Sequence, residues 1–513
     1  AHMNTLFIRA DATSQIGSGH VMRCIALAQA WQDQGGRVTF ISHCDSDTLR
    51  IRIIGEGFNL VSIEKPHPHP SDLTLTLSCI NPETTGPNTG AWLVLDGYHF
   101  TPDYQKAIKD AGIRLLIIDD MNHLPYYHAD IILNQNIHAT DLKYNCDPNT
   151  KLLLGPKYVL LRREFLKYRD FKREIPDKAR KILVTMGGAD PDNVTLKVIQ
   201  ALNLLNDSEL EVKVVIGPSN PHLESIKKEL SLSPFSFHLS PSVDNMADLM
   251  AWADLAITAG GSTCWELAYM GVPSIFIVLA KNQLPLAEKL SKQRRVLNLG
   301  WHGNVTPFKI MHAAAEVIGR KDIYIEKVEN GSKIVDGKGT KRILFYLEEK
   351  IMIRPVQKED CELIWMWSND EGTRKASFFE AFIPWEEHVE WFNSRIADQN
   401  HYFYIITDSQ EKPIGQIRFS VKSDNAVISF SIAPEFRGFG IGTKALKLGT
   451  QKLFQESNVN AIIAFVRVDN QVSLKVFQKA GFVIEEELYL HGKKSYKLCL
   501  YRGNEYETNK DRQ

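Results

Sequence analysis

The chain has 513 residues, of which 44% are hydrophobic and 24% charged, and its formal net charge is -1. One hydrophobic core rarely organises so long a chain, so about three units of ~150 residues each are expected. The balanced charge argues against nucleic acid or an anionic membrane as the main partner, because both call for a basic surplus. No apolar run approaches the ~18 residues of a membrane span, and the seven cysteines form no Cys-x-x-Cys pair. A cytoplasmic protein with reduced thiols is expected.

Apolar strand-like runs alternate with helical patterns over the first 350 residues, which indicates parallel sheets. The first series predicts a helix at residues 20–34 and strands near residues 5–9, 38–42, 91–95 and 115–119. After a charged stretch at 162–181, the second series predicts strands near residues 182–186, 212–216, 255–258 and 274–278. The expected fold class is α/β, with two doubly wound domains at residues 3–165 and 166–350 and a ligand cleft between them.

A third pattern begins after the segment 331–339, which is rich in glycine and lysine. Antiparallel-type strands are predicted near residues 402–407, 413–421 and 426–432. Residues 351–502 are therefore expected to form a separate α+β domain, followed by a polar tail at 503–513 that frays.

A glycine-rich turn, Gly17-Ser18-Gly19, leads into the first predicted helix, which begins at His20. The turn aims backbone N–H groups and the positive end of a helix at one point, an arrangement that binds phosphate. This helix end disfavours a charged imidazolium, so His20 is expected to keep the neutral form that a general base needs. The alternative is that His20 only caps the helix. Arg23 takes the place of the third glycine of a Gly-x-Gly-x-x-Gly fingerprint, so a nicotinamide cofactor is not expected.

Two further glycine pairs stand in the second predicted domain. Gly187-Gly188 follows a strand and precedes Asp190 and a helix from Asn193, while Gly260-Gly261-Ser262-Thr263 precedes a helix with Glu266 one turn in. Paired glycines let a backbone approach a diphosphate closely, and the two hydroxyls add donors. Glu266 is placed to accept both hydroxyls of a ribose. Together the pairs predict a nucleotide-diphosphate site; the alternative is two structural turns.

Three long segments, residues 11–23, 187–193 and 259–266, resemble those of a known family. They occur in the same order, together with Ile118-Asp119-Asp120, Asn134-Gln135-Asn136, Gly155-Pro156 and Lys281-Asn282-Gln283. The family is that of the UDP-sugar hydrolases of pseudaminic acid biosynthesis, which are similar to the glycosyltransferase that makes lipid II. The resemblance implies the two-domain GT-B fold over residues 3–345. It also implies hydrolysis of UDP-2,4-diacetamido-2,4,6-trideoxy-β-L-altrose to the free sugar and UDP.

The resemblance implies roles for single residues as well. His20 would activate the water, Asn193 and Glu266 would hold the nucleotide, and Tyr98, in the short match Asp96-Gly97-Tyr98, would lie near the sugar. The residues expected to bind UDP or the sugar are Gly17, Gly19, Arg23, Tyr98, Gly187, Gly188, Asp190, Asn193, Gly261, Ser262, Thr263, Glu266, Asn282 and Gln283.

No metal is expected to be required. UDP leaves as a stable dianion, so the site mainly needs a water, a base and donors for the charge that develops on the β-phosphate. The sequence has no ordered Asp/Glu/His cluster, and His67-Pro68-His69-Pro70 is interpreted as a surface turn rather than a set of ligands.

The last domain carries Arg437-Gly438-Phe439-Gly440-Ile441-Gly442 after a strand-like run and before a helix. This segment resembles the pyrophosphate loop of the GNAT acetyltransferase superfamily, and residues 469–482 resemble its second coenzyme A segment. The resemblance implies acetyl-CoA as cosubstrate, bound by Ile432, Arg437, Gly438, Gly440, Ile441, Gly442, Asn470, Ser473 and Phe477. Many members have an acidic tyrosine where this chain has Phe477, and phenylalanine cannot protonate a thiolate. Glu435 and His401 are candidate proton acceptors; the alternative is that each is solvated or structural.

The acceptor of the acetyl group is suggested by residues 367–392, which are similar to the acetyltransferase of the same pathway. That enzyme acetylates the 4-amino group of a UDP-amino sugar. The alternative is that the aromatic residues here are plain helix core. The fusion favours the first interpretation, because such an enzyme would make the substrate that the first two domains hydrolyse.

Two other function classes stay open. The GT-B half would be a glycosyltransferase if a lipid or sugar acceptor attacks in place of water. The last domain would be a regulatory or protein-directed module if it acetylates a peptide or binds no acetyl-CoA.

Overall fold

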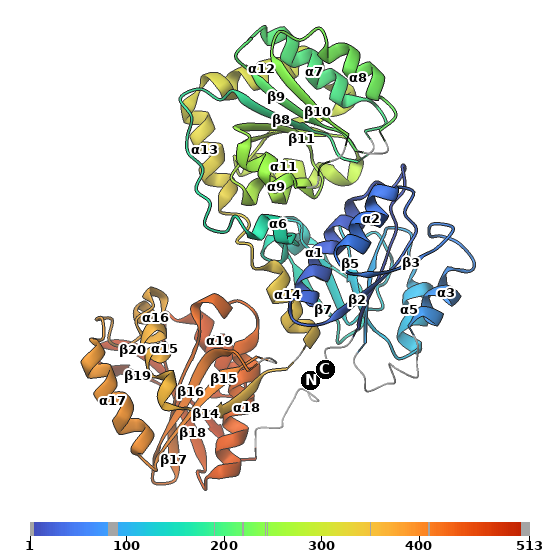
Figure 1. The fold of residues 1–513 in the computed structure, drawn as a ribbon. Coiled ribbons are helices and arrows are strands. Elements are labelled where there is room, and N and C mark those ends of the chain that lie inside the picture. The colour runs from blue at the N-terminus through green and yellow to red at the C-terminus, as the bar shows by residue number, and fades with distance from the viewer. Residues whose placement is uncertain are drawn as a thin grey trace. The chain divides into compact units, whose positions relative to one another are not determined.

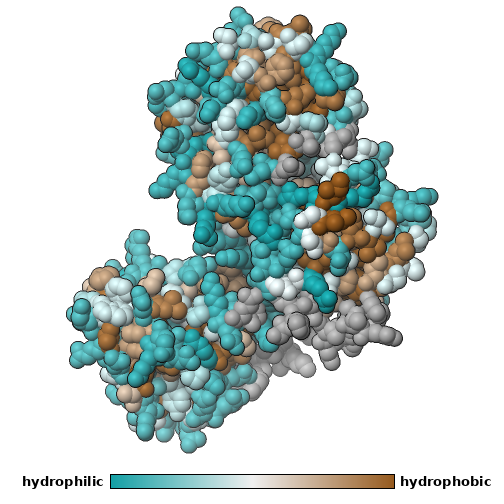
Figure 2. Space-filling view, in the orientation of Figure 1, coloured by the Kyte–Doolittle hydropathy of each residue, from teal (hydrophilic) through white to brown (hydrophobic). Residues whose placement is uncertain are grey.

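The computed structural model describes residues 5–80, 91–188, 190–217, 220–241, 243, 245–348, 350–408 and 411–503. Ala189, in the second glycine turn, and the predicted tail beyond Gly503 lie outside these residues. The contacts divide the chain into two compact units, Ala1–Leu347 and Glu348–Gln513. No helix among the described residues has the length and hydropathy that a membrane span requires. Figure 2 shows hydrophilic side chains over much of one face, with apolar ones in scattered patches.

The first unit opens with a seven-stranded parallel sheet in the order β3-β2-β1-β4-β5-β6-β7 (Figure 1). Its strands are β1 (Thr5–Ala10), β2 (Arg37–Ser42), β3 (Asn59–Ser62), β4 (Trp92–Asp96), β5 (Arg114–Ile118), β6 (Ile131–Asn134) and β7 (Lys151–Leu154). The connections carry α1 (Gly19–Asp33), α2 (Asp47–Gly55), α3 (Asp72–Cys79), α5 (Pro102–Asp110), and the 3₁₀ turns η1 (Ala139–Asp141) and η2 (Pro156–Tyr158). The order reverses between β1 and β4, which is the switch point where doubly wound sheets bind ligands.

A second parallel sheet follows in the same unit, in the order β10-β9-β8-β11-β12-β13. Its strands are β8 (Lys181–Thr185), β9 (Glu211–Val215), β10 (Ser236–Ser240), β11 (Leu255–Ala259), β12 (Ser274–Val278) and β13 (Leu297–Trp301). Its helices are α6 (Arg163–Leu166), α7 (Val194–Leu205), α8 (Leu223–Leu230), α9 (Met246–Trp252), α10 (Thr263–Tyr269), η3 (Lys281–Gln283), α11 (Leu284–Lys292), η4 (His302–Asn304), α12 (Pro307–Gly319), α13 (Lys321–Ser332) and α14 (Gly339–Glu348). The second switch point lies between β8 and β11.

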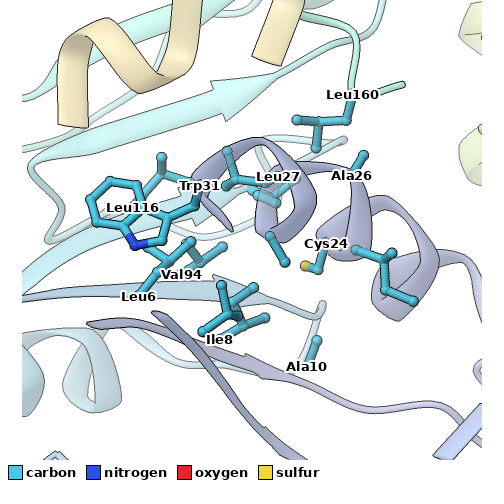
Figure 3. Packing of buried hydrophobic residues seen from close by; sticks show 14 of the residues in the cluster. Leu6, Ile8, Ala10, Cys24, Ala26, Leu27, Trp31, Val94, Leu116 and Leu160 are labelled. Carbon is cyan, nitrogen blue, oxygen red and sulfur yellow. The ribbon is translucent and has the colours of Figure 1, made fainter. Parts of the chain in front are cut away.

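The core of the first sheet shows why β1 and α1 form where they do (Figure 3). Leu6, Ile8 and Ala10 alternate along β1, so all three lie on one face, and they pack with Leu27 and Trp31 of α1. All five side chains are buried. The rigid core therefore holds the beginning of α1 at the carboxyl end of β1.

Helix α14 packs against the first sheet, although the sequence predicts residues 166–350 as one domain with the second sheet. Ile343, Leu344 and Leu347 of α14 belong to the core of the first sheet. Arg342 also donates to the carbonyl oxygen of Lys157 at 2.6 Å. The apolar face of α14 thus returns the chain to the first domain after the second is complete.

The second unit is built on a seven-stranded mixed sheet in the order β14-β15-β16-β17-β18-β20-β19. Its strands are β14 (Met352–Pro355), β15 (His401–Thr407), β16 (Pro413–Lys422), β17 (Asn425–Ile432), β18 (Ala461–Arg467), β19 (Val483–Leu490) and β20 (Lys493–Tyr501). Its helices are η5 (Lys358–Asp360), α15 (Cys361–Ser368), α16 (Glu371–Ala376), α17 (Trp385–Ala397), η6 (Pro434–Phe436), α18 (Ile441–Glu456) and α19 (Gln471–Lys479). The pair β17–β18 is parallel and the other pairs are antiparallel.

Candidate functional site

His20 lies in the first turn of α1, at the switch point of the first sheet. Its Nδ1 is 2.6 Å from Oδ1 of Asp96, the last residue of β4. Burial raises the pKa of Asp96, but the charges of Arg23 and His20 outweigh burial and lower it below its ordinary value. A buried carboxylate accepts the Nδ1 proton of a neutral imidazole, which leaves Nε2 as the basic nitrogen. The sequence did not predict Asp96 as a functional residue.

Arg23, one turn after His20, binds two carboxylates. Its guanidinium donates to Asp96 at 2.6 and 2.7 Å and to Asp120 at 2.9 and 3.0 Å. The side chain is only 7% exposed. Arg23 was predicted to bind the substrate; in the structure its donors face protein carboxylates, so its direct effect is to hold Asp96 and Asp120 ionised. Burial raises the pKa of Asp120, and the Arg23 charge more than reverses this.

Tyr98 connects this cluster to the second sheet. Its hydroxyl donates to Asp120 at 2.9 Å and accepts from Nδ2 of Asn282 at 3.2 Å. Its ring meets the imidazole of His20 edge-on, with the ring centroids 4.8 Å apart. Burial, and then the charge of Asp120, raises the pKa of Tyr98, which keeps the phenol neutral. The structure therefore brings together His20, Tyr98 and Asn282, which the sequence placed near the sugar.

The predicted glycine turns at residues 17–19, 187–188 and 260–263 lie close together, beside His20. A Cβ on Gly188 would lie 3.3 Å from Oγ of Ser18, and a Cβ on Gly19 would lie 3.9 Å from Oγ of Ser262. Gly17 and Gly187 have φ of +79° and +89°, which favours glycine at both positions. The ends of α1 and α10 thus present backbone N–H groups to one region.

Asp190, which is predicted to bind UDP or the sugar, caps α7 in the structure. Its carboxylate accepts from the backbone N–H groups of Val194 at 2.8 Å and Thr195 at 2.9 Å, and from the Thr195 hydroxyl at 2.6 Å. The positive end of α7 is therefore already satisfied by protein. Asn193 donates to Ser225 at 3.1 Å, while its buried Oδ1 has no partner among the described residues.

Glu266 lies one turn into α10 and has a partner that the sequence did not predict. Arg162, from the segment that joins the two sheets, lies 3.0 Å from the Glu266 carboxylate. Burial raises the pKa of Glu266 although Arg162 opposes it. Ser262 and Thr263 begin the same helix. Gln283 supports the preceding turn by packing on Gly260, and its Oε1 accepts from the Leu279 N–H at 2.9 Å.

The prediction of a surface turn at residues 67–70 agrees with the structure, in which these residues form bends and a turn and Pro68 and Pro70 are exposed. His67 is half-buried, lies 2.7 Å from the Asp72 carboxylate, and stacks on Phe100 at a centroid distance of 4.1 Å. Asp72 in turn binds the buried Arg9. Over the part of the chain that the structure describes, no three His, Cys, Asp or Glu side chains are grouped to hold a metal ion.

In the second unit, residues 437–442 form a turn between η6 and α18. Gly438 and Gly440 have φ of +80° and +75°. The Arg437 guanidinium lies 2.6 Å from the Asp370 carboxylate and 2.7 Å from the Thr373 hydroxyl, so this side chain fixes the turn. Gly442 is required by packing, because a Cβ there would lie 3.0 Å from Val476. The predicted pyrophosphate-binding residues thus lie at the N-terminus of α18, where backbone N–H groups are available to an anion.

Strands β17 and β18 separate beside this turn. β17 pairs with β18 only at residues 425–427, opposite 461–463. Beyond that point β17 continues to Ile432 and β18 to Arg467 without further pairing between them. The edge of β17 that faces β18 is therefore open along residues 428–432, where an extended ligand with amide groups can hydrogen-bond.

The second predicted coenzyme segment begins α19. Asn470 caps this helix by accepting from the Ser473 N–H at 3.1 Å. Phe477 is buried against Phe430 and Phe482, with centroid distances of 6.3 and 5.1 Å. Its role in the structure is packing, in agreement with its inability to supply a proton.

The two candidate proton acceptors differ in position. Glu435 is exposed and lies in η6, directly after β17. His401 pairs with Ser420, four residues along β16 from Gln416, which pairs with Ser431 near the end of β17. That separation is about 13 Å at ~3.4 Å per residue, so His401 lies far from the coenzyme turn.

Comparisons with protein families match both halves. Residues 181–327 match the glycosyltransferase family 28 C-terminal domain, and residues 350–483 match the acetyltransferase (GNAT) domain. Together with the two parallel sheets, these matches confirm the predicted fold class: a GT-B-like pair of doubly wound domains followed by a GNAT domain.

Three relatives are similar to the whole chain or to one part of it. Protein MJ1062 of Methanocaldococcus jannaschii, which is uncharacterized, is 27% identical over 92% of this chain and 95% of its own length. UDP-2,4-diacetamido-2,4,6-trideoxy-beta-L-altropyranose hydrolase of Campylobacter jejuni is 27% identical over 57% of this chain and 97% of its own. Spermidine N(1)-acetyltransferase of Escherichia coli K12 is 22% identical over 30% of this chain and 86% of its own. The predicted resemblance to a hydrolase joined to a GNAT acetyltransferase is confirmed.

Proposed function

We propose that this chain carries out two consecutive steps on one nucleotide-linked sugar. The second unit transfers the acetyl group of acetyl-CoA to the 4-amino group of UDP-4-amino-4,6-dideoxy-N-acetyl-β-L-altrosamine. The first unit then hydrolyses the product to 2,4-diacetamido-2,4,6-trideoxy-L-altrose and UDP. The similarity to the named hydrolase and the GNAT match support the pair of reactions.

The His20–Asp96 pair at the switch point is the observation that carries the hydrolytic step. Asp96 accepts the Nδ1 proton, so Nε2 of His20 takes a proton from water as the oxygen attacks the anomeric carbon. The bond from that carbon to the phosphate oxygen breaks, and UDP leaves with the electron pair. The proton on His20 then passes to solvent. Arg23 keeps Asp96 ionised throughout, which stabilises the imidazolium that forms.

The nucleotide is proposed to lie across the converging turns. N–H groups at the beginning of α1 and α10, with the hydroxyls of Ser262 and Thr263, would stabilise the charge that develops on the β-phosphate. Glu266 would accept from the ribose hydroxyls, and Tyr98 and Asn282 would contact the sugar. The proposed steps use no metal ion; Arg23 forms ion pairs with both acidic groups beside His20.

The acetyl transfer is proposed to occur where β17 and β18 separate. The backbone of residues 437–442 would bind the pyrophosphate of acetyl-CoA, and its pantetheine arm would pair with the open edge near Ile432. The 4-amino nitrogen attacks the thioester carbon, the C–S bond breaks, and the amine proton leaves to solvent or to Glu435. Since Phe477 carries no proton, the thiolate takes its proton from solvent.

The proposed order is tested by incubating the purified protein with the UDP-4-amino sugar, with and without acetyl-CoA, and identifying products by mass spectrometry and NMR. The proposal expects free diacetamido sugar and UDP only with acetyl-CoA. Release of UDP at the same rate without acetyl-CoA would contradict the order. Dependence of UDP release on an added lipid or sugar acceptor would support a glycosyltransferase.

A further inference from the structure

A cluster of arginines without acidic partners lies on one face of the sheet in the second unit. Arg418 of β16 has no carboxylate within ion-pair distance among the residues that the structure describes. Among the described residues, Arg395 of α17 and Arg374 of α16 also have no carboxylate within ion-pair distance. By contrast, neighbouring carboxylates are taken: Asp370 pairs with Arg437, and Glu380 pairs with Arg467.

Arg418 is held in place by aromatic and amide groups. Its Cζ lies 4.7 Å from the ring centroid of Trp391 and 5.9 Å from that of Phe403, and its Nη1 donates to Oε1 of Gln416 at 3.3 Å. Burial, followed by the charges of Arg395 and Arg374, lowers the pKa of Arg418 to about 10. Arg395 lies one turn after Trp391 on α17, beside the ring on which Arg418 stacks, so these two cations are neighbours. Nη1 and Nη2 of Arg374 donate to the carbonyl oxygens of Phe379 and Ala381 and to the Ser377 hydroxyl.

The surroundings of Arg418 contain further polar groups that lack partners. Nε of Arg374 is buried without a hydrogen-bond partner in the described part of the chain, and so is Nε2 of His401. His401 is near, because Arg418 and Arg395 contribute, after burial, to lowering its pKa to about 4; exposed Asp398 opposes them. Isolated cations in a half-buried position cost stability, so a cluster of them indicates a bound anion.

The strand register places this cluster beside the proposed transfer point. Arg418 pairs with Ser429, and Gln416 pairs with Ser431, whose hydroxyl accepts from Nε2 of Gln416 at 3.2 Å. These side chains share one face, because residues two apart on a strand point the same way. Arg418 and Gln416 are therefore roughly 7 Å apart along the strand, about the width of one sugar ring.

That face is partly uncovered, which leaves room for a ligand. Ser429 and Val427 are exposed although β17 lies in the middle of the sheet, and Val427 is 40% exposed. The opposite face is closed: Ile417 packs against α18 at Gly449, and Phe430 packs on Phe477 of α19.

We infer that Arg418, with Arg395, binds the diphosphate of a nucleotide-linked acceptor and so selects an anionic amine over a polyamine. This inference rests on the proposed function and names the residues that choose its acceptor. It separates this domain from the relative whose name specifies spermidine, because a polycation would be repelled by arginines that have no carboxylate partner. The diphosphate of acetyl-CoA is assigned to residues 437–442, so the arginine cluster is a second anion site.

The test compares two acceptors with the same reacting amine on the full chain: the UDP-4-amino sugar and the 4-amino sugar without its nucleotide. Arg418→Gln is expected to lower kcat/KM for the UDP-linked acceptor by about 10- to 100-fold, because charge-assisted hydrogen bonds to phosphate are lost. The value for the free amino sugar and the KM for acetyl-CoA are expected to stay unchanged. The kcat/KM of Arg418→Lys for the UDP-linked acceptor is expected to lie between those of the wild type and Arg418→Gln, since lysine keeps the charge but lacks the paired donors of the guanidinium.

Lys447→Gln is the matched control, because Lys447 is exposed on α18, which packs on the opposite face of the sheet, and its replacement removes the same charge. A structural role for Arg418 would lower the melting temperature and impair both acceptors equally, and this outcome would overturn the inference. Acetylation of spermidine in preference to the UDP-linked amine would overturn it as well. If the wild-type protein acetylates neither amino sugar, the proposed function itself fails.

Discussion

At the scale of single residues, the pair proposed to carry out hydrolysis is His20 and Asp96. The sequence predicted His20, because it follows a glycine turn at the beginning of a helix. It did not predict Asp96, which is 76 residues away and reaches His20 only because β1 and β4 are neighbours at the switch point. The available signal was a carboxylate at the end of an apolar strand. Strand adjacency, which no local pattern encodes, was the missing information.

We predict that Asp96→Asn lowers the rate of UDP release by about 10²–10⁴-fold, because the imidazole loses the acceptor that orients it. UDP affinity and acetyl transfer are expected to remain. The rate is measured as UDP released from acetylated substrate. Asp45→Asn is the control, since Asp45 also pairs with a histidine, His43, at 2.7 Å but near the surface. Equal rates for Asp96→Asn and the wild type would remove Asp96 from the mechanism.

Arg418 illustrates a second limit of sequence reading. It stands within the apolar run of β16, between Ile417 and Phe419, where a charge breaks the pattern. The sequence offered no reason to prefer a ligand over a surface position. Only the register with β15 and β17 shows that it faces Trp391 and an uncovered strip of sheet.

At the scale of elements, many strands with apolar runs were predicted, but β6 and β18 were missed although both are apolar and largely buried. β1, β4, β11 and β12 are buried along most of their length, so their sequences are continuously apolar. β10 and β19 are largely exposed and carry polar side chains, and the sequence did not reveal them. Asp190, in a turn predicted to bind a diphosphate, accepts from the first two N–H groups of α7, and the sequence did not predict this cap.

The Asp190 cap of α7 predicts different effects for two substitutions. Asp190→Ala should reduce the free energy of unfolding by ~0.5–2 kcal/mol, because the N–H groups of Val194 and Thr195 lose their acceptor. Asp190→Asn should cost less than the alanine change, because its amide oxygen can still accept from one of the two N–H groups, and should leave UDP affinity unchanged. Melting temperature and calorimetric titration with UDP measure the two effects.

Thr306→Ala, which removes the cap of α12 by the same kind of change, is the control for the stability effect alone. Weakened UDP binding by Asp190→Asn at an unchanged melting temperature would show that the carboxylate contacts the nucleotide after all.

At the scale of the whole molecule, the chain comprises two compact units that are proposed to act on the same substrate in succession. Arg437→Glu places a negative charge at the coenzyme turn and breaks the ion pair with Asp370. It should stop acetylation and spare hydrolysis of substrate acetylated beforehand, while His20→Ala should do the reverse. Both activities are measured on each full-length variant. Loss of both activities in a folded variant would indicate coupling between the units.

The central claim is that water, activated by His20, attacks the sugar carbon and not phosphorus. The most direct test is hydrolysis of the UDP-diacetamido sugar in H₂¹⁸O with EDTA and no added acceptor, followed by mass spectrometry of the UDP. The account predicts full activity and UDP without ¹⁸O, because the bond to the sugar carbon breaks and UDP keeps its own oxygen. UDP that contains one ¹⁸O atom, or no turnover until an acceptor is added, would contradict it.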